Sequence, residues 1–164
     1  MPTFNHFDLI PALKQALDAA GFATPTPIQA LSLPHVLGGR DVLAQAPTGS
    51  GKTAAFGLGL LQRLDARAIR TQALVLCPTR ELADQVGKQI GPQLASLAAH
   101  APHIVVGTPG RVQELLHKKA LDLSGVTALV LDEADRMLDM GFEKSIKDIL
   151  RTLPKTRQSL LFSA

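Results

Sequence analysis

Small residues and a lysine follow a short apolar run in the stretch AQAPTGSGKTAA, residues 44–55. The stretch fits a relaxed form of the pattern G-x-x-x-x-G-K-[ST], with Ala46 first and Gly51, Lys52 and Thr53 last. Glycine lets backbone N–H groups point at a bound anion, and a helix starting near Lys52 would add its positive end. We therefore predict a nucleoside triphosphate loop, with Lys52 between the β- and γ-phosphates and the Thr53 hydroxyl on Mg²⁺. The other loop residues expected to contact the nucleotide are Pro47, Thr48, Gly49 and Ser50.

Two carboxylates follow another apolar run in the stretch LVLDEADR, residues 129–136. At the end of a strand, Asp132 could hold Mg²⁺ through water, and Glu133 could accept a proton from an attacking water. Each stretch alone has a structural alternative. The loop could be a glycine-rich turn without a ligand, and the carboxylates could be an acidic helix start. Their combination favours the functional interpretation and makes Lys52, Asp132 and Glu133 the candidate catalytic residues.

Composition excludes several classes of protein and site. The chain has 164 residues, of which 46% are hydrophobic and 19% charged, which is typical of one globular domain. The net charge of +3 is compatible with a polyanionic partner without requiring one. The single Cys77 excludes an internal disulfide, and the scattered histidines do not predict a metal site. No apolar run could span a bilayer and the start lacks a signal-peptide pattern, so a cytoplasmic protein is expected.

The elements that must position these residues alternate along the chain. Five short, continuously apolar runs are typical of strands covered on both faces, and helical segments separate them. This order predicts an α/β fold, a parallel β-sheet with helices on both faces, in which ligands lie at the carboxyl ends of the strands. The predicted strands are 41–46, 73–77, 103–107, 128–132 and 159–164. The predicted helices are 10–20, 27–37, 52–64, 80–99, 109–118 and 133–151, the last in two pieces broken near Gly141.

The motif DEAD at residues 132–135 resembles the signature of the DEAD-box ATP-dependent RNA helicases. Further family motifs follow in the expected order: GFATPTPIQ (21–29), APTGSGKT (46–53), PTRELA (78–83), TPGR (108–111) and SA (163–164). The resemblance covers the whole chain and is greatest to DbpA-type bacterial members, which act on ribosomal RNA. It implies a RecA-like P-loop NTPase fold over residues 1–164, the helicase ATP-binding domain, with the Q motif in residues 1–30.

The resemblance assigns the adenine-binding residues. Gln29 would read the N6 and N7 edge of adenine, because an amide donates and accepts at once. Phe4 would stack on the base, with Phe7 as the alternative, although Phe4 could equally be an N-terminal core contact. Thr26 would support the loop through side-chain hydrogen bonds.

The resemblance also assigns RNA contacts and a coupling element. Arg80, Thr108, Gly110 and Arg111 would meet RNA phosphates without reading sequence. From local sequence alone, helix capping by threonines beside surface arginines is the alternative. Three further residues would couple the nucleotide state to RNA separation: Asp135, Ser163 and Ala164. The Ser163 hydroxyl would form a hydrogen bond toward Asp135.

The chain departs from the family pattern in two places. Family members have a further strand and a Gly-Gly motif where this chain passes directly from residue 90 to residue 91. We interpret the missing segment as a natural deletion, an engineered deletion or an omitted loop, and the omitted loop is favoured. The second RecA-like domain is absent, so little hydrolysis and no unwinding are expected of this fragment. The predicted function is the ATP-binding half of an RNA helicase that unwinds or remodels RNA, possibly in ribosome assembly. The alternatives are a non-catalytic nucleotide-gated RNA-binding module, a DNA translocase and a small-molecule kinase.

Overall fold

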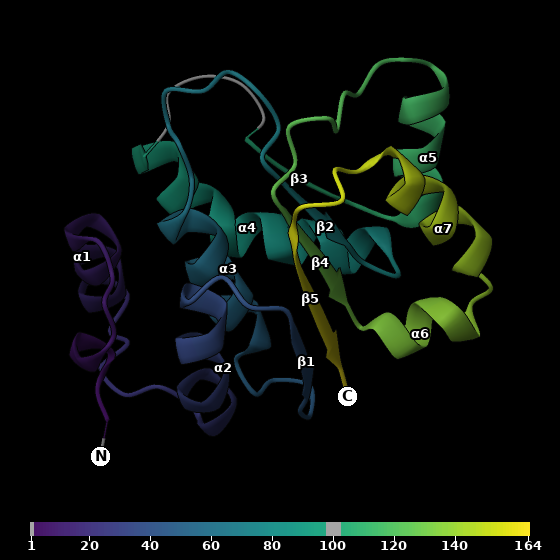
Figure 1. Ribbon diagram of the computed structural model, residues 1–164. Coiled ribbons are helices and arrows are strands. Elements are labelled where there is room, and N and C mark those ends of the chain that lie inside the picture. The colour runs from purple at the N-terminus through teal and green to yellow at the C-terminus, as the bar shows by residue number, and fades with distance from the viewer. Residues whose placement is uncertain (1, 98–102) are drawn as a thin grey trace.

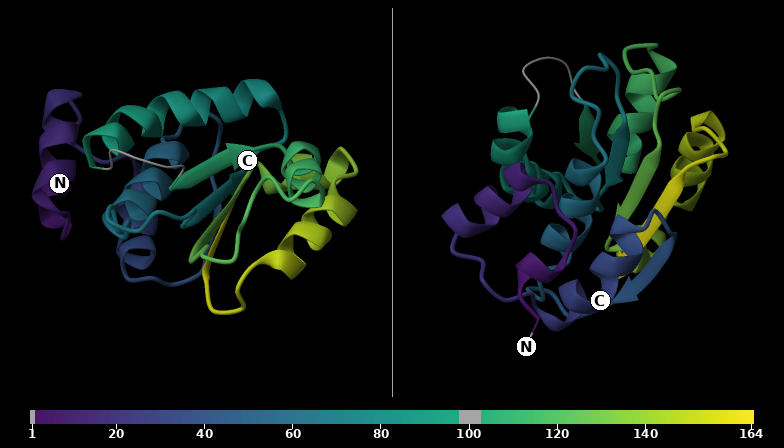
Figure 2. Two further views of the ribbon diagram at one scale, coloured as in Figure 1. Left: turned by 90° about the horizontal axis from the view of Figure 1, so that it is seen from above. Right: turned by 60° about the vertical axis from the view of Figure 1, so that its left-hand side comes forward.

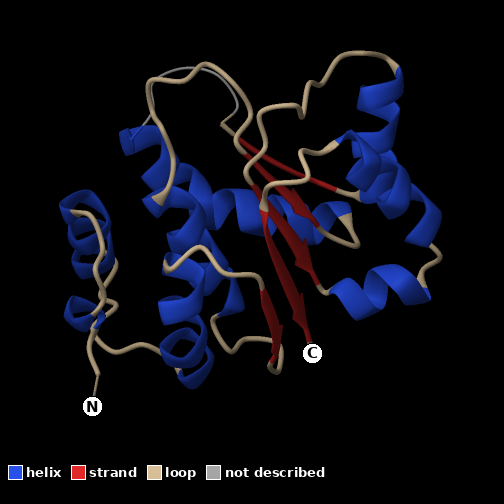
Figure 3. Cartoon of the chain, in the orientation of Figure 1, coloured by secondary structure: helices blue, strands red, loops and turns tan. Residues whose placement is uncertain are grey.

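A five-stranded sheet organises the chain, with strand order β1-β5-β4-β2-β3 and every neighbouring pair parallel (Figures 1 and 3). The computed structural model describes residues 2–97 and 103–164. The strands are β1 (Val42–Gln45), β2 (Ala73–Leu76), β3 (Ile104–Gly107), β4 (Ala128–Asp132) and β5 (Gln158–Ser163). The helices are η1 (Phe4–His6), α1 (Pro11–Ala19), α2 (Pro27–Leu37), α3 (Lys52–Gln62), α4 (Arg80–Leu97), α5 (Pro109–His117), α6 (Ala134–Asp139) and α7 (Glu143–Thr152).

Helices cover both faces of the sheet, as Figure 2 shows from above. Alternate residues of β2 point to opposite faces, so Val75 packs in the core under α1 to α4 while Leu74 and Leu76 pack in the core under α5 to α7. The central strands β2 and β4 are buried on both faces, and their residues are apolar at nearly every position. The edge strand β1 differs from the expectation, because its Leu43 is 81% exposed. The predicted α/β fold with a parallel sheet is confirmed, and the predicted strands and helices lie within a few residues of the observed ones.

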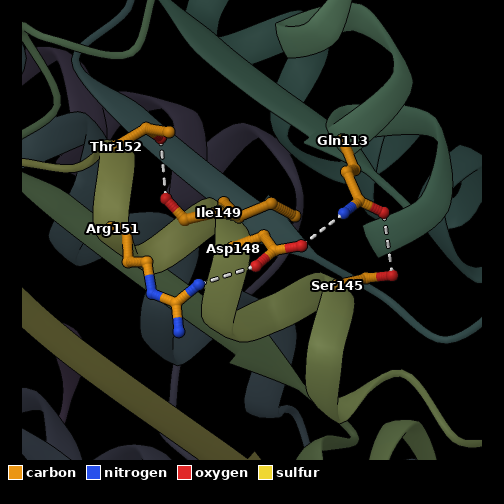
Figure 4. Close-up of polar contacts among 6 residues, drawn as sticks. All are labelled: Gln113, Ser145, Asp148, Ile149, Arg151 and Thr152. Carbon is orange, nitrogen blue, oxygen red and sulfur yellow. Dashed lines mark hydrogen bonds and ion pairs between the residues drawn. The ribbon is translucent and has the colours of Figure 1, made fainter.

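Hydrogen bonds of Gln113 connect α5 to α7, two of the helices that cover the same face of the sheet (Figure 4). Gln113 Nε2 donates to Asp148 Oδ2 at 2.8 Å, and Ser145 Oγ donates to Gln113 Oε1 at 3.0 Å. Asp148 also accepts from Arg151 Nη1 at 3.0 Å. The Gln113 amide therefore has partners on two successive turns of α7, which sets how the two helices are aligned.

Helix α4 crosses the junction 90/91 without a break, although Pro92 lies inside it. The part of the helix prediction beyond Leu97 lies outside the described residues. No helix in the described part of the chain is long and apolar enough to cross a membrane.

Candidate nucleotide-binding site

The loop between β1 and α3 has the backbone that its glycines predict. Gly49 and Gly51 have φ angles of +82° and +89°, a region that side chains with a Cβ rarely adopt. A Cβ on Gly51 would also collide with the side-chain amide of Gln29. Glycine at position 51 is thus required both by the turn and by the close approach of α2.

Gln29 ties the start of α2 to this loop. Its Nε2 donates to the Gly51 carbonyl at 3.0 Å, and its Oε1 accepts from the Thr26 backbone N–H at 2.9 Å. Thr26 Oγ1 in turn accepts from the Gln29 backbone N–H at 3.4 Å, which completes a capping box. The buried Gln29 amide keeps one N–H and one oxygen lone pair for a ligand. Thr26 acts on the loop through Gln29, since its own described hydrogen bonds stay within the helix start.

Lys52 is buried and bridges the ends of two strands. Its ammonium group donates to the Ala46 carbonyl at 2.7 Å and to the Ser163 carbonyl at 3.1 Å. The Ser163 carbonyl also accepts from the Ala46 backbone N–H at 3.0 Å. The cation therefore lies at the carboxyl edge of the sheet, where the sequence predicted it, and links the loop to the end of β5.

Asp132 ends β4 beside this lysine. Only 4% of its surface is exposed. Burial, together with the neighbouring charge of Glu133, raises its pKa from 3.8 to about 6, although Lys52 partly offsets this. Cys77 lies fully buried nearby, and burial with the charges of the same two carboxylates raises its pKa to about 12. The site thus contains a carboxylate whose charge is incompletely compensated by the protein.

Glu133 adopts a left-handed backbone conformation, with φ +55° and ψ +52°, at the start of α6. Such a conformation in a residue with a Cβ is strained by about 1–3 kcal/mol and is concentrated at functional sites. Its side chain forms an ion pair with Arg136 at 3.2 Å. Glu133 also lines the cavity described next.

These groups line one cavity of about 640 Å³. The predicted site residues in its lining are Gln29, Thr48, Gly49, Gly51, Lys52, Thr53, Asp132 and Glu133, whereas Ala46, Pro47 and Ser50 of the predicted phosphate loop (46–53) do not line it. The rest of the lining is mostly apolar and comes from α1, α3 and α4, as with Leu13, Leu58 and Ile90, although Gln85 and Gln89 of α4 also line it. The helical spacing of apolar residues predicts the helix over 10–20, but it does not distinguish a helix face that packs in the core from one that lines a cavity.

Both aromatic candidates for the adenine, Phe4 and Phe7, lie outside the cavity. Phe4 is buried and packs at 6.3 Å from Phe7, and neither ring lines the cavity. Phe22, which the sequence did not single out as a stacking residue, lines the cavity and is half exposed. The signal that could have identified it is its place in the stretch GFATPTPIQ.

The predicted RNA-contacting residues meet at a second hollow of about 440 Å³. Arg80, Thr108 and Arg111 line it, together with Asp84. Arg111 is exposed and pairs with Glu114 at 2.9 Å. Capping explains only part of this region, because Thr79 Oγ1 accepts from the Leu82 backbone N–H while Thr108 forms no side-chain cap. Gly110 is exposed beside the hollow.

The predicted coupling residues are only partly brought together. The Ser163 carbonyl meets Lys52, and the Ala164 carbonyl accepts from Gln45 Nε2 at 3.0 Å. Asp135 is exposed, and within residues 2–97 and 103–164 no hydrogen bond joins it to the Ser163 hydroxyl. The predicted hydroxyl contact is therefore not made in this structure.

The residues present fit a magnesium ion. Mg²⁺ bound with a nucleotide needs only one or two carboxylates, with phosphate oxygens and water completing its shell. Asp132 has no ion-pair partner in the described part of the chain, and Thr53 lines the same cavity. A hydroxyl and a buried carboxylate at one edge of the sheet are suitable oxygen ligands.

Comparisons with known proteins show which proteins the chain resembles. The chain is 50% identical to the ATP-dependent RNA helicase DbpA of Escherichia coli (strain K12) over 186 aligned residues, which cover 100% of the chain and 40% of that protein. A DEAD box protein from the hyperthermophile Methanococcus jannaschii matches 99% of the chain with half of its own, at a TM-score of 0.89 and 37% identity. Saccharomyces cerevisiae Dbp5 bound to RNA and ADP BeF3 matches the whole chain with 46% of its own, at a TM-score of 0.91 and 34% identity.

The chain thus spans less than half of the E. coli relative. The sequence profile of the DEAD/DEAH box helicases matches residues 26–164, from the capping box of α2 to the last described residue. The phosphate loop, the DEAD motif and the parallel sheet all lie within that match, and the chain belongs to the DEAD/DEAH box helicase family.

Proposed function

We propose that the chain is the ATP-binding half of an ATP-dependent RNA helicase that unwinds or remodels RNA duplexes. The observation that carries this proposal is the single cavity shared by the phosphate loop, Lys52 and the carboxylates Asp132 and Glu133. The identity to an ATP-dependent RNA helicase from E. coli supports the same assignment.

Each side chain has a task that follows from its position. Lys52 would exchange its two carbonyl partners for oxygens of the β- and γ-phosphates, which are stronger acceptors because they are charged. Thr53 and Asp132 would hold Mg²⁺, which neutralises phosphate charge when bound. Glu133 would orient the attacking water and accept its proton. The adenine would lie at the Gln29 end of the cavity, against Phe22 in this structure or against Phe4 if the N-terminal segment rearranges.

Nucleotide binding tests the first part of the proposal. Titration of the chain with a fluorescent ATP analogue and Mg²⁺ should give saturable binding that Lys52→Ala weakens at least tenfold. Phe22→Ala and Phe4→Ala compared side by side identify the stacking ring, since a lost stack weakens binding by about 1–3 kcal/mol. Absence of binding by the wild-type chain, with its fold confirmed by circular dichroism, would contradict the proposal.

RNA is the proposed partner, and ribosomal RNA its source. Arg80, Thr108 and Arg111 would contact the phosphates through the second hollow. Arg80→Gln with Arg111→Gln should lower the affinity for single-stranded RNA. The slope of log K against log salt should become less steep by about 1.4, because each of the two lost phosphate contacts contributes about 0.7. An equal effect of a pair of substitutions outside the lining of the hollow, Lys14→Gln with Lys144→Gln, would argue against this surface.

Catalysis is proposed to need a second RecA-like domain that joins this one in a longer chain. The alignment with the E. coli relative is 186 residues long against the 164 of this chain, which supports a missing segment at the junction 90/91, where an omitted loop is the favoured interpretation. A cytoplasmic location is proposed.

The fragment alone should hydrolyse ATP slowly with or without RNA, and full RNA-stimulated turnover would refute this. In a two-domain chain, Glu133→Gln should abolish turnover and spare ATP binding, whereas a non-catalytic module would be unaffected.

A further inference from the structure

A basic surface lies at the edge of the sheet opposite the nucleotide cavity. Four connections lead into the amino ends of β1, β5, β4 and β2: residues 38–41, 153–157, 118–127 and 63–72. We name them the amino-end loops. In Figure 1 the loops before β2, β4 and β5 lie in the upper half of the view, while the C-terminal end of β5 lies in the lower half.

Charge is distributed unevenly between these loops and the rest of the chain. The amino-end loops hold eight of the 17 Lys and Arg residues but only three of the 14 Asp and Glu residues. The remainder of the chain has nine basic and eleven acidic residues, so the net positive charge of the protein resides in these loops. The basic members are Arg40, Arg63, Arg67, Arg70, Lys118, Lys119, Lys155 and Arg157. The acidic members are Asp41, Asp65 and Asp122.

Side-chain contacts hold several of these groups side by side. The buried Gln158 donates to the Arg40 carbonyl at 2.8 Å and accepts from Arg63 Nη1 at 3.3 Å. Arg63 covers Gly39 so closely that an added Cβ would lie 2.8 Å from its guanidinium. These contacts join the loop before β2 to the loops before β1 and β5.

The other end of the surface is fixed in a similar way. An added Cβ on Gly125 would lie 2.6 Å from Arg70 Cδ, so this arginine packs across the loop before β4. Four neighbouring parallel strands span about 14 Å, at about 4.8 Å between strands. The amino-end loops therefore present one continuous band of that width.

Internal neutralisation accounts for only part of this charge. In the described part of the chain only one of the eight basic side chains forms an ion pair, that of Lys118 with Glu114. Each loop follows the C-terminus of a helix, α2, α3, α5 or α7, and each such terminus carries about half a negative charge. Four termini offset about two of the five excess positive charges, which leaves about three for an external anion.

We infer that the amino-end loops form a second polyanion surface, which binds the phosphate backbone of an RNA strand. Five of the eight cations are arginines, whose planar fork suits phosphate oxygens. The choice of RNA rests on the proposed function. The surface itself is separate from the hollow at Arg80 and Arg111, which lies at the carboxyl ends of the strands.

The test is the salt dependence of RNA binding. Arg67, Arg70 and Lys155 are exposed and form no side-chain hydrogen bond within the described residues, so changing all three to Gln should preserve the fold. Binding of the whole chain to a labelled oligouridylate is measured by fluorescence anisotropy over a range of salt concentrations. The slope of log K against log salt should become less steep by about 2, and affinity at about 0.1 M salt should fall on the order of 100-fold.

Matched variants decide the outcome. Lys14→Gln, Lys144→Gln and Lys147→Gln together change the net charge equally and should leave the slope nearly unchanged, because none of the three lies in the amino-end loops or lines the hollow. An equal effect of this control would overturn the inference. Binding to polyglutamate, a polyanion without phosphates, is measured in parallel, and a triple variant that loses polyglutamate binding but keeps RNA binding would also overturn it. Arg67→Lys with Arg70→Lys should retain the wild-type slope.

The hollow at the other edge is tested separately. If Arg80→Gln with Arg111→Gln has no effect while the triple variant does, the RNA surface proposed earlier fails and this one stands. If the triple variant melts early, Arg67→Gln with Lys155→Gln replaces it, because only Arg70 packs against a neighbouring loop. With that pair, a change in slope of about 1.4 is expected and no change refutes the inference.

Discussion

Replacing Asp132 by asparagine should make the fold more stable at neutral pH. Burial, with the charge of Glu133, raises the Asp132 pKa from 3.8 to about 6 in the folded chain. Between these values the folded chain holds a proton that the unfolded chain has released, so the free energy of unfolding falls as pH rises. Because the Asp132 pKa rises by about two, the free energy of unfolding is about 3 kcal/mol lower above pH 6 than it is at a pH below 3.8. Asparagine has the same shape and carries no charge, so the variant should not show this loss.

The measurement is urea unfolding of both proteins from about pH 4 to about pH 8. The wild-type chain should lose about 3 kcal/mol relative to Asp132→Asn across that window, and the two should converge below it. Asp135→Asn is the matched control, because Asp135 is exposed in the same motif. Parallel pH profiles for the wild type and Asp132→Asn, or a wild type that gains on the variant as pH rises, would refute the reasoning. Addition of Mg²⁺ and ATP should then stabilise the wild type more than the variant.

Three further substitutions or reactions have defined outcomes. Gly51→Ala should destabilise the fold by about 1–3 kcal/mol in urea unfolding and weaken ATP binding, because it strains the loop and displaces Gln29. Gly59→Ala should lower the free energy of unfolding by about 1–3 kcal/mol, because the new methyl collides with Val36, and adding Val36→Ala should recover part of that loss in a double-mutant cycle. Cys77 should not react with a disulfide reagent until the chain unfolds, since it is fully buried and its pKa is about 12, and reaction at the rate of a free thiol would contradict this.

The sheet and the phosphate loop could be predicted because local sequence determines them. Strands buried on both faces must be apolar at every position, so runs such as 73–77 and 128–132 identify themselves. A loop that wraps phosphates needs glycine at positions of positive φ, and Gly51 has that angle. Parallel strands bring their carboxyl ends to one edge, which is why Lys52 and Asp132 could be placed in one site from the sequence.

Other parts of the site depend on contacts between distant segments. Whether Leu13 faces a core or a cavity depends on how far α1 stands from α3 and α4, and helical spacing does not encode that distance. The burial of Phe4 depends on the whole N-terminal segment packing beside α1. The bonds from Lys52 to the Ala46 and Ser163 carbonyls depend on the distance between the ends of β1 and β5.

Two unusual features of the carboxyl edge are relieved by the same kind of ligand. Within the part of the chain that the structure describes, Lys52 has only neutral carbonyl partners for its hydrogen bonds, and Asp132 is a buried carboxylate without an ion pair. A triphosphate with Mg²⁺ would give the lysine charged acceptors and give Asp132 a cation. Keeping the buried Asp132 carboxylate charged costs the fold about 3 kcal/mol, and this free energy becomes available to binding when the nucleotide and its cation compensate that charge. A more stable edge would bind the nucleotide less well, which is why Asp132→Asn should gain stability and lose function together.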